Sequence, residues 1–476
     1  MPDFFAQPGG EKRLTVSEAQ EDFKILRRAL EERHPGIDRY REPGAFQQAL
    51  NTAEAQINKP LAVNEFFAVL SPVIDVLDCG HTEIQVPKTE VDALRKTAKL
   101  LPFKFGIDKN HLFIRLSYDA DTTLGVGLDV IRINGHSTDS LLRAWHGFFS
   151  SDGYNETMQN RSGESIFREY YAVFAEQPDS FLLELRNHRS GKESRIRVSH
   201  LTYPQLEKRY NARFERNGPP KKLALYFIDS TTAVMNIETF QGKELRKSHA
   251  HFRRFVKKSM RELERRHCRR LVIDLRDNTG GNVNLGIFLY RRIAKENFRY
   301  IDSATVPTKK PIRFHRYTDK SFLFNLNFLA VKKRDGKCIY RIHHLTKTHK
   351  PVSTAFGGEV FVLTNGLTFS NASNFAALVK YQKRGMIVGE EPGGAMNGCS
   401  GMTYFNVKLP NSKLVVRIPL AKVIYPFKPY SDYGHGIKPD FEIAGHPNCP
   451  VMMGELEFLS PLFYSGKHAC PASRKQ

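Results

Sequence analysis

Two stretches of the chain show the same order of apolar and polar positions. Each begins with a short apolar run, continues through a small turn that contains glycine, and ends with apolar residues spaced about 3.6 positions apart. The first stretch is Leu271–Ile293 and the second is Val360–Gln382. This order predicts a buried strand, a turn and a helix in both stretches. Repeated alternation of strands and helices favours an α/β core.

The segments before this core have other patterns. Residues 14–86 are predicted to be mainly helical, with a capping box at Ser17 and Gln20 and an "HPG" sequence that ends the first helix. Residues 101–201 alternate short β-like segments with turns, and one of these turns is the hairpin dipeptide Asn134-Gly135.

These patterns divide the chain into four parts. We expect a helical domain, a β-rich domain, an α/β core that carries a lysine-rich insertion, and a turn-rich tail. Their predicted limits are 1–95, 96–205, 206–445 with the insertion at about 302–351, and 446–476.

The chain is strongly basic, with 72 Lys and Arg against 50 Asp and Glu and a formal net charge of +22. Such a positive charge is typical of proteins that bind nucleic acid, an anionic surface or an acidic substrate. The densest basic run, residues 246–270, places its apolar residues on one helical stripe and its cations mostly elsewhere, as a solvated helix does. The chain has no zinc-finger spacing, aromatic ribonucleoprotein motif or zipper heptads, so we do not expect nucleic-acid binding.

The six cysteines are far apart and form no C-x-x-C, so they indicate neither a disulfide scaffold nor a metal cluster. Cys449 and Cys470 in the tail can be interpreted as a pair or as free thiols. No stretch of about 18 uncharged apolar residues is present, so we expect no membrane-spanning segment. The first residues lack the basic and apolar regions of a signal peptide, as a trimmed chain also would.

Three positions carry candidate chemistry. Ser370 lies where the second predicted strand meets its helix, either as an N-cap or as a nucleophile favoured by the helix dipole. Taken alone, the cap is the better interpretation. The Gly280-Gly281 turn lacks nucleotide-binding spacing, and it serves either close packing or an oxyanion. His81 lies on a turn, where a lone histidine is most often a surface residue.

Four motifs in order resemble the core of the carboxy-terminal processing (tail-specific) and tricorn-type serine proteases. They are "VIDLRDNTGGN", then about ninety residues later "VLTNGLTFSNASNFAALV", then "GMIVGEEPGG", and finally "GHGIKPDFEI". Four elements in the right order are more specific than any single one. The resemblance implies an α/β (α+β multidomain) fold with a crotonase/ClpP-like ββα core, a PDZ-like domain at 96–205 and an N-terminal helical domain.

The resemblance also implies a nucleophile and a base. It places the nucleophile at Ser370, which reverses the N-cap interpretation. The processing branch uses a lysine base, but this chain has Ala395 at that position and no lysine in the segment. The tricorn branch uses a histidine, which "CGHTEI" places at His81. We therefore expect a Ser-His pair in which the imidazole accepts the hydroxyl proton and returns it to the leaving amine.

The other roles follow from the same resemblance. The tricorn branch orients its histidine with a glutamate just before the closing turn, and this chain has no glutamate there. Asp432 is the nearest carboxylate and our candidate. The expected oxyanion donors are the backbone of Asn371 and of Gly280 or Gly281.

The function implied is a serine endopeptidase that acts on peptides or partly unfolded proteins without a metal, nucleotide or other cofactor. The alternative is an inactive member that binds an apolar ligand or a peptide, like the retinoid-binding proteins with the same core. Relatives with a helical N-terminal region of this kind are mostly bacterial envelope or exported proteins. We therefore expect a periplasmic or secreted protein, with the cytoplasm as the alternative. The sequence leaves open whether the protein forms a homo-oligomer.

Overall fold

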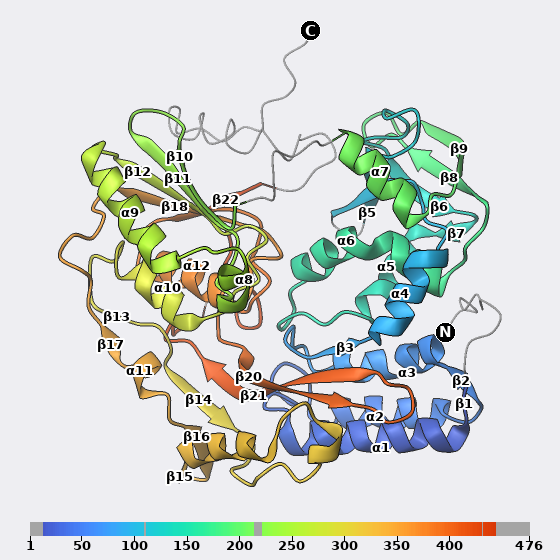
Figure 1. The fold of residues 1–476 in the computed structure, drawn as a ribbon, viewed down its shortest axis with the longest axis horizontal. Helices are drawn as coiled ribbons and strands as arrows, with labels where there is room; N and C mark the ends of the chain where they lie inside the picture. Colours follow the sequence, from blue (N-terminus) through green and yellow to red (C-terminus); the bar gives the residue numbers. More distant parts are fainter. Residues whose placement is uncertain (1–12, 109–110, 214–220, 431, 444–476) are drawn as a thin grey trace.

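The computed structural model describes residues 13–108, 111–213, 221–430 and 432–443, arranged around three larger sheets (Figure 1). Within these ranges, no helix combines the length and the apolar character needed to cross a bilayer. The predicted tail, with Cys449 and Cys470, lies outside the described residues.

The central sheet of the core has six strands. Their order is β10 (Leu223–Phe227), β11 (Thr232–Ile237), β12 (Arg270–Asp274), β18 (Glu359–Thr364), β19 (Met386–Gly389) and β22 (Phe441–Glu442). β10 and β11 form an antiparallel hairpin, and each later neighbour is parallel to the one before it. Both faces of the sheet are buried, which explains why its strands are continuous apolar runs in the sequence.

Three helices cover one face of this sheet. They are α9 (Phe252–Arg265), α10 (Val283–Tyr290) and α12 (Asn371–Tyr381), and the shorter α8 (Gly242–Lys247) lies near their ends (Figure 1). α9 is the predicted basic helix. Its Phe252, Val256 and Leu263 are buried in the main core, and most of its cations are exposed, which confirms the solvated-face interpretation.

A helical layer precedes the core, as predicted. It consists of α1 (Val16–Arg33), α2 (Ala45–Gln56) and α3 (Val63–Asp75). The capping box of α1 is formed by Thr15 and Glu18, so the prediction of Ser17 and Gln20 was wrong. Thr15 has the extended backbone that an N-cap requires, whereas Ser17 already lies inside the first turn. The "HPG" sequence ends α1, with His34 as its C-cap.

The second sheet joins this layer to the core. Its strands are β15 (Val331–Arg334), β16 (Lys337–Tyr340), β14 (Ser303–Val306), β21 (Val415–Ile424) and β20 (Ser400–Lys408), with β3 (Glu83–Gln85) added beside β21. β15 and β16 form the hairpin of the predicted insertion. β20 and β21 lie on the helical layer (Figure 1), where buried Asp22 accepts hydrogen bonds from the backbone of Asn411 and Ser412.

Short elements complete the helical layer and the region of the insertion. They are β1 (Arg13–Leu14), β2 (Leu61–Ala62), β13 (Phe298–Arg299), β17 (Thr348–His349), the 3-10 helices η1 (His315–Tyr317) and η2 (Phe322–Ala330), and α11 (His343–Thr346). The helical layer, the second sheet and the core bury their apolar residues in one continuous cluster.

The third sheet belongs to the predicted β-rich segment. Its strands are β4 (Phe103–Asp108), β5 (His111–Ser117), β6 (Asp129–Ile133), β8 (Ser180–Arg186) and β9 (Glu193–Ser199), with β7 (His136–Ser137) beside β6. Its helices are α4 (Lys88–Thr97), α5 (Thr138–His146), α6 (Thr157–Phe174) and α7 (Tyr203–Arg213). Asn134-Gly135 forms the predicted turn before α5. This segment has its own core around Trp145, and its likeness to a PDZ domain stays a prediction.

Candidate active site

The two strand-turn-helix units predicted from the sequence lie side by side. β12 and β18 are parallel neighbours with Asp274 opposite Leu363, so the turns that follow them meet at one edge of the sheet. The Phe369 N–H donates to the Asn278 carbonyl at 3.0 Å across this junction. A Cβ atom on Gly280 would lie 2.9 Å from the Asn371 nitrogen, so only glycine allows this approach.

Ser370 occupies a strained turn at the start of α12. Its backbone has φ 55° and ψ −121°, a region that costs a residue with a side chain about 1–3 kcal/mol. The side chain makes no capping hydrogen bond, although the residue stands at the N-cap position. A half-exposed serine on a sharp strand-to-helix turn is the arrangement that presents a nucleophile at a helix N-terminus.

The three predicted oxyanion residues are not equivalent: Gly280 packs against Ser370 and Asn371, and Gly281 packs against Phe240 and Gln241. The Gly280 N–H donates to Asn278 Oδ1 at 2.9 Å, so it is not available to a substrate. For the N–H groups of Gly281 and Asn371, no acceptor is recorded among the described residues. Gly280 therefore provides clearance, while Gly281 and Asn371 are the candidate donors. The sequence did not distinguish the two glycines.

His81 is held on a turn between α3 and β3 by contacts from two directions. Ser150 Oγ donates to the carbonyls of Cys79 and Thr82 at 2.8 and 3.0 Å. From the other side, His34 Nε2 lies 2.9 Å from Thr82 Oγ1. His34 Nδ1 accepts the Gly36 N–H, so Nε2 carries the proton and donates to Thr82. The "HPG" sequence therefore fixes the turn that carries His81.

The His81 ring lies against the turn that carries Ser370. Its centroid is 4.4 Å from that of Phe369, the residue before Ser370, and 5.7 Å from that of Tyr404 on β20. Neither ring nitrogen has a hydrogen-bond partner among the described residues. Burial, with smaller effects of Arg417 and Arg39, lowers the pKa of His81 to about 3, so the imidazole is neutral at physiological pH. A neutral ring is the form that accepts a proton.

The carboxylate beside His81 is that of Asp152, which the sequence analysis missed. Asp152 Oδ1 lies 3.9 Å from His81 Nδ1, about 1 Å beyond an ordinary N–H···O hydrogen bond. The same oxygen accepts the Gly80 N–H at 2.9 Å. Burial raises the pKa of Asp152 to about 7, and Arg39 with the N–H groups of Gly80 and Ala395 oppose this shift.

Asp432, our predicted partner of His81, forms an ion pair with Lys438. Its Oδ1 is 3.0 Å from Lys438 Nζ, and the contact recorded beside His81 is that of Asp152. Asp152 follows α5 in the β-rich segment, far from the motifs of the core. Its only signal in the sequence was a polar turn, "SSDGYN", that resembles many surface loops.

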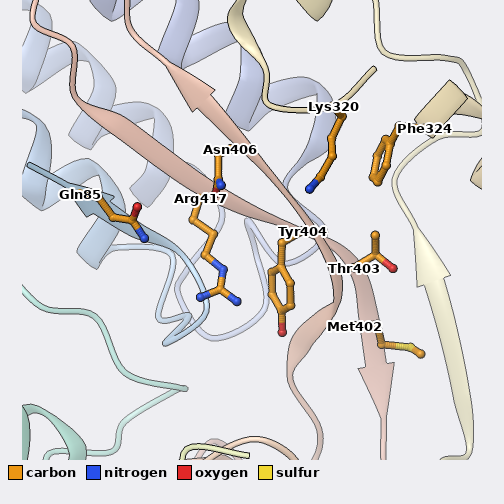
Figure 2. A pocket seen from close by; sticks show the side chains of 8 residues that line it. All are labelled: Gln85, Lys320, Phe324, Met402, Thr403, Tyr404, Asn406 and Arg417. Atoms are coloured by element: carbon orange, nitrogen blue, oxygen red, sulfur yellow. The ribbon is translucent and has the colours of Figure 1, made fainter. Parts of the chain in front are cut away.

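A cavity of about 530 Å³ lies next to Tyr404, beside the strands β20 and β21 (Figure 2). The Arg417 guanidinium sits 4.1 Å from the centre of the Tyr404 ring, and the two side chains point the same way in Figure 2. Lys320 and Phe324 reach the cavity from the insertion. Its lining is Gln85, Lys320, Phe324, Met402, Thr403, Tyr404, Asn406 and Arg417.

Comparisons with known proteins identify a family for part of the chain and a shared fold for most of it. Residues 231–443 match the sequence profile of Peptidase family S41. A mutant of CPAF shares the fold with a TM-score of 0.66 and 12% identity, over 94% of this chain and 96% of that one. CPAF complexed with lactacystin gives a TM-score of 0.62 and 12% identity, over 94% of this chain and 97% of that one. The comparison with curated sequences gave no match.

The sequence match and the structural matches cover different lengths of the chain. The structural matches confirm the α/β fold along nearly the whole chain, and the sequence match confirms the family suggested by the four motifs. Residues 231–443 therefore form a serine-type peptidase domain of family S41.

Proposed function

We propose that this peptidase is a serine endopeptidase in which Ser370 is the nucleophile and His81 is the general base. The observation that carries the proposal is the strained Ser370 turn, packed against the Gly280-Gly281 turn, with the buried His81 ring on the adjacent Phe369. The neutral imidazole and the two unused backbone N–H groups support the same assignment.

The proposed reaction follows from these groups. His81 accepts the Ser370 hydroxyl proton as the oxygen attacks the peptide carbonyl carbon. The carbonyl electrons move onto its oxygen, where the N–H groups of Gly281 and Asn371 and the N-terminus of α12 stabilise the negative charge. The imidazolium then returns the proton to the leaving amine, and water repeats the sequence on the acyl-enzyme.

Asp152 is the group that orients and stabilises the imidazolium in this proposal. The carboxylate faces His81 Nδ1, and closing the 3.9 Å gap to a hydrogen bond would raise the basicity of the ring. Catalytic hydrogen bonds are often long without substrate and shorten in the complex. We therefore place Asp152, not Asp432, in the third role.

Peptides and partly unfolded proteins are the proposed substrates. The alternative that we derived from the sequence, an inactive protein with an apolar ligand, fits less well with the cavity beside Tyr404. Arg417, Lys320, Gln85 and Asn406 supply polar and cationic groups to its lining. Such a lining suits a polar substrate side chain better than a hydrocarbon.

Replacing Ser370 or His81 by alanine should lower kcat/KM on an unfolded protein substrate by about 10⁴–10⁶-fold, because the two side chains act as one unit. The double variant should be no slower than either single variant. Ser373→Ala is the matched control, since its buried hydroxyl donates to the Gly394 carbonyl and should affect stability more than turnover. Additive losses in the double variant would contradict the pairing.

The acid is tested by comparing Asp152→Asn with Asp432→Asn. The first should reduce kcat by about 10²–10⁴-fold, because the imidazolium loses its charged partner. The second should stay near the wild-type rate, because Asp432 contacts Lys438. Steady-state kinetics above pH 7 decide between them, and the reverse order of the two effects would restore Asp432 to the site.

The clearance role of Gly280 predicts a selective loss of kcat in Gly280→Ala. The added methyl would displace the Asn371 N–H, and loss of one oxyanion donor costs about 10²–10³-fold. Gly336→Ala is the matched control, because Gly336 also has a positive φ, of 74°, but an added Cβ there meets no atom within 4 Å. Equal kcat in the two variants would remove Gly280 from the site.

A further inference from the structure

A buried thiol lies beside the proposed catalytic histidine. Cys79 precedes His81 by two residues, and one ligand atom each from Cys79, His81 and Asp152 lies within 4.8 Å of the others. The three side chains are 2%, 6% and 1% exposed. The peptidase mechanism uses His81 and Asp152 but not Cys79, whose thiol lies at the edge of the main core and makes a weak contact, at 3.9 Å, with the Ser400 carbonyl.

The cluster contains buried polar atoms that lack partners. His81 Nδ1, His81 Nε2 and Asp152 Oδ2 have no hydrogen-bond partner in the part of the chain that the structure describes. An unpaired buried polar group costs about 1–3 kcal/mol. A single cation placed among the sulfur, the imidazole nitrogen and the carboxylate oxygen would engage all three side chains.

The donor set indicates which cation fits. Sulfur, nitrogen and oxygen ligands at three corners of a tetrahedron are typical of Zn²⁺, whereas Ca²⁺ and Mg²⁺ select oxygen ligands. Ligand atoms around a tetrahedral Zn²⁺ are roughly 3.3–3.6 Å apart. His81 Nδ1 and Asp152 Oδ1 are 3.9 Å apart, and all three ligand atoms lie within 4.8 Å of one another, so the side chains must move closer together on binding the metal.

The surroundings of the sulfur also suit a ligand. Burial and, to a smaller extent, Asp152 raise the pKa of the Cys79 thiol to about 12, while the Thr82 hydroxyl, the His81 backbone N–H and Arg39 favour its thiolate. Thr82 is itself held by His34. Outer groups of this kind orient metal ligands and strengthen their binding.

We propose that Cys79, His81 and Asp152 form a Zn²⁺ site that inhibits the peptidase. The inhibitory part rests on the proposed function. As the Zn–S bond forms, Cys79 releases its proton to solvent. The lone pair of His81 Nδ1 and a carboxylate oxygen of Asp152 then occupy two further coordination positions of the metal. Nε2 then carries the ring proton and cannot accept one from Ser370. The metal therefore uses the same atoms that would orient and activate the base.

Nearby positive charge limits the affinity. Arg39 is buried next to Asp152, and Arg417 also acts on His81. These guanidinium groups oppose a divalent cation, while the thiolate and the carboxylate together balance its charge. We therefore expect reversible binding, weaker than that of a structural zinc site and removable by a chelator.

Metal binding is tested with Co²⁺, which gives a thiolate charge-transfer band when sulfur is a ligand. Chelator-treated wild type and Ser370→Ala should each bind one Co²⁺ with this band. Since loss of an outer-shell partner alone weakens metal binding by about 10–100-fold, Cys79→Ser and Cys79→Ala should lose at least about 100-fold and the band with it. Cys268→Ser is the control, because this free thiol follows α9 and interacts with Arg266, Asp229 and Glu262, not with the cluster.

Inhibition is tested separately on peptide turnover. Zn²⁺ should stop wild-type turnover, EDTA should restore it, and Cys79→Ser should keep basal turnover while losing the zinc sensitivity. A wild type without the Co²⁺ band, or a band that persists in both Cys79 variants, would overturn the site. Equal zinc inhibition of wild type and Cys79→Ser would overturn the regulation. Absence of turnover without metal would instead contradict the proposed function and leave the Co²⁺ result intact.

Discussion

The close approach of two turns at one edge of the core sheet is the constraint on which the site depends. Phe369 and Asn278 are joined by a backbone hydrogen bond, and Gly280 leaves no room for a side chain against Ser370 and Asn371. This contact holds the Ser370 backbone in a conformation that its side chain disfavours. Because parallel strands place both turns at the same edge, the rigid sheet supports the strain.

The base reaches this edge from a different part of the chain. His81 belongs to the helical layer, its turn is fixed by His34 from the end of α1, and its carboxylate neighbour Asp152 comes from the β-rich segment. Three segments must therefore pack correctly before the site is complete. The helical layer and the core share one hydrophobic cluster, and the His81 ring contacts Phe369 where these two parts meet.

Much of this arrangement could be predicted from local patterns, and some of it could not. Apolar runs followed by glycine or serine turns predicted the strands and helices around Gly280 and Ser370, because periodicity depends on neighbours in the sequence. The pairing of His81 with Asp152 depends on packing between segments, and no local pattern records it. The sequence also could not show which of Gly280 and Gly281 has a free N–H group. That depends on the Asn278 side chain, which accepts the N–H of Gly280 in the folded protein. The predicted N-cap, Ser17, lies two residues from the observed one, Thr15. Periodicity defines the ends of a helix less well than its middle.

The most direct test of the account is the intact mass of the protein after reaction with a fluorophosphonate probe, measured on wild type, Ser370→Ala and His81→Ala. The account predicts a single adduct on wild type and none on either variant, because only a serine activated by the histidine reacts. No adduct on folded wild type, or an adduct that persists in either variant, would contradict the assignment of Ser370 and His81.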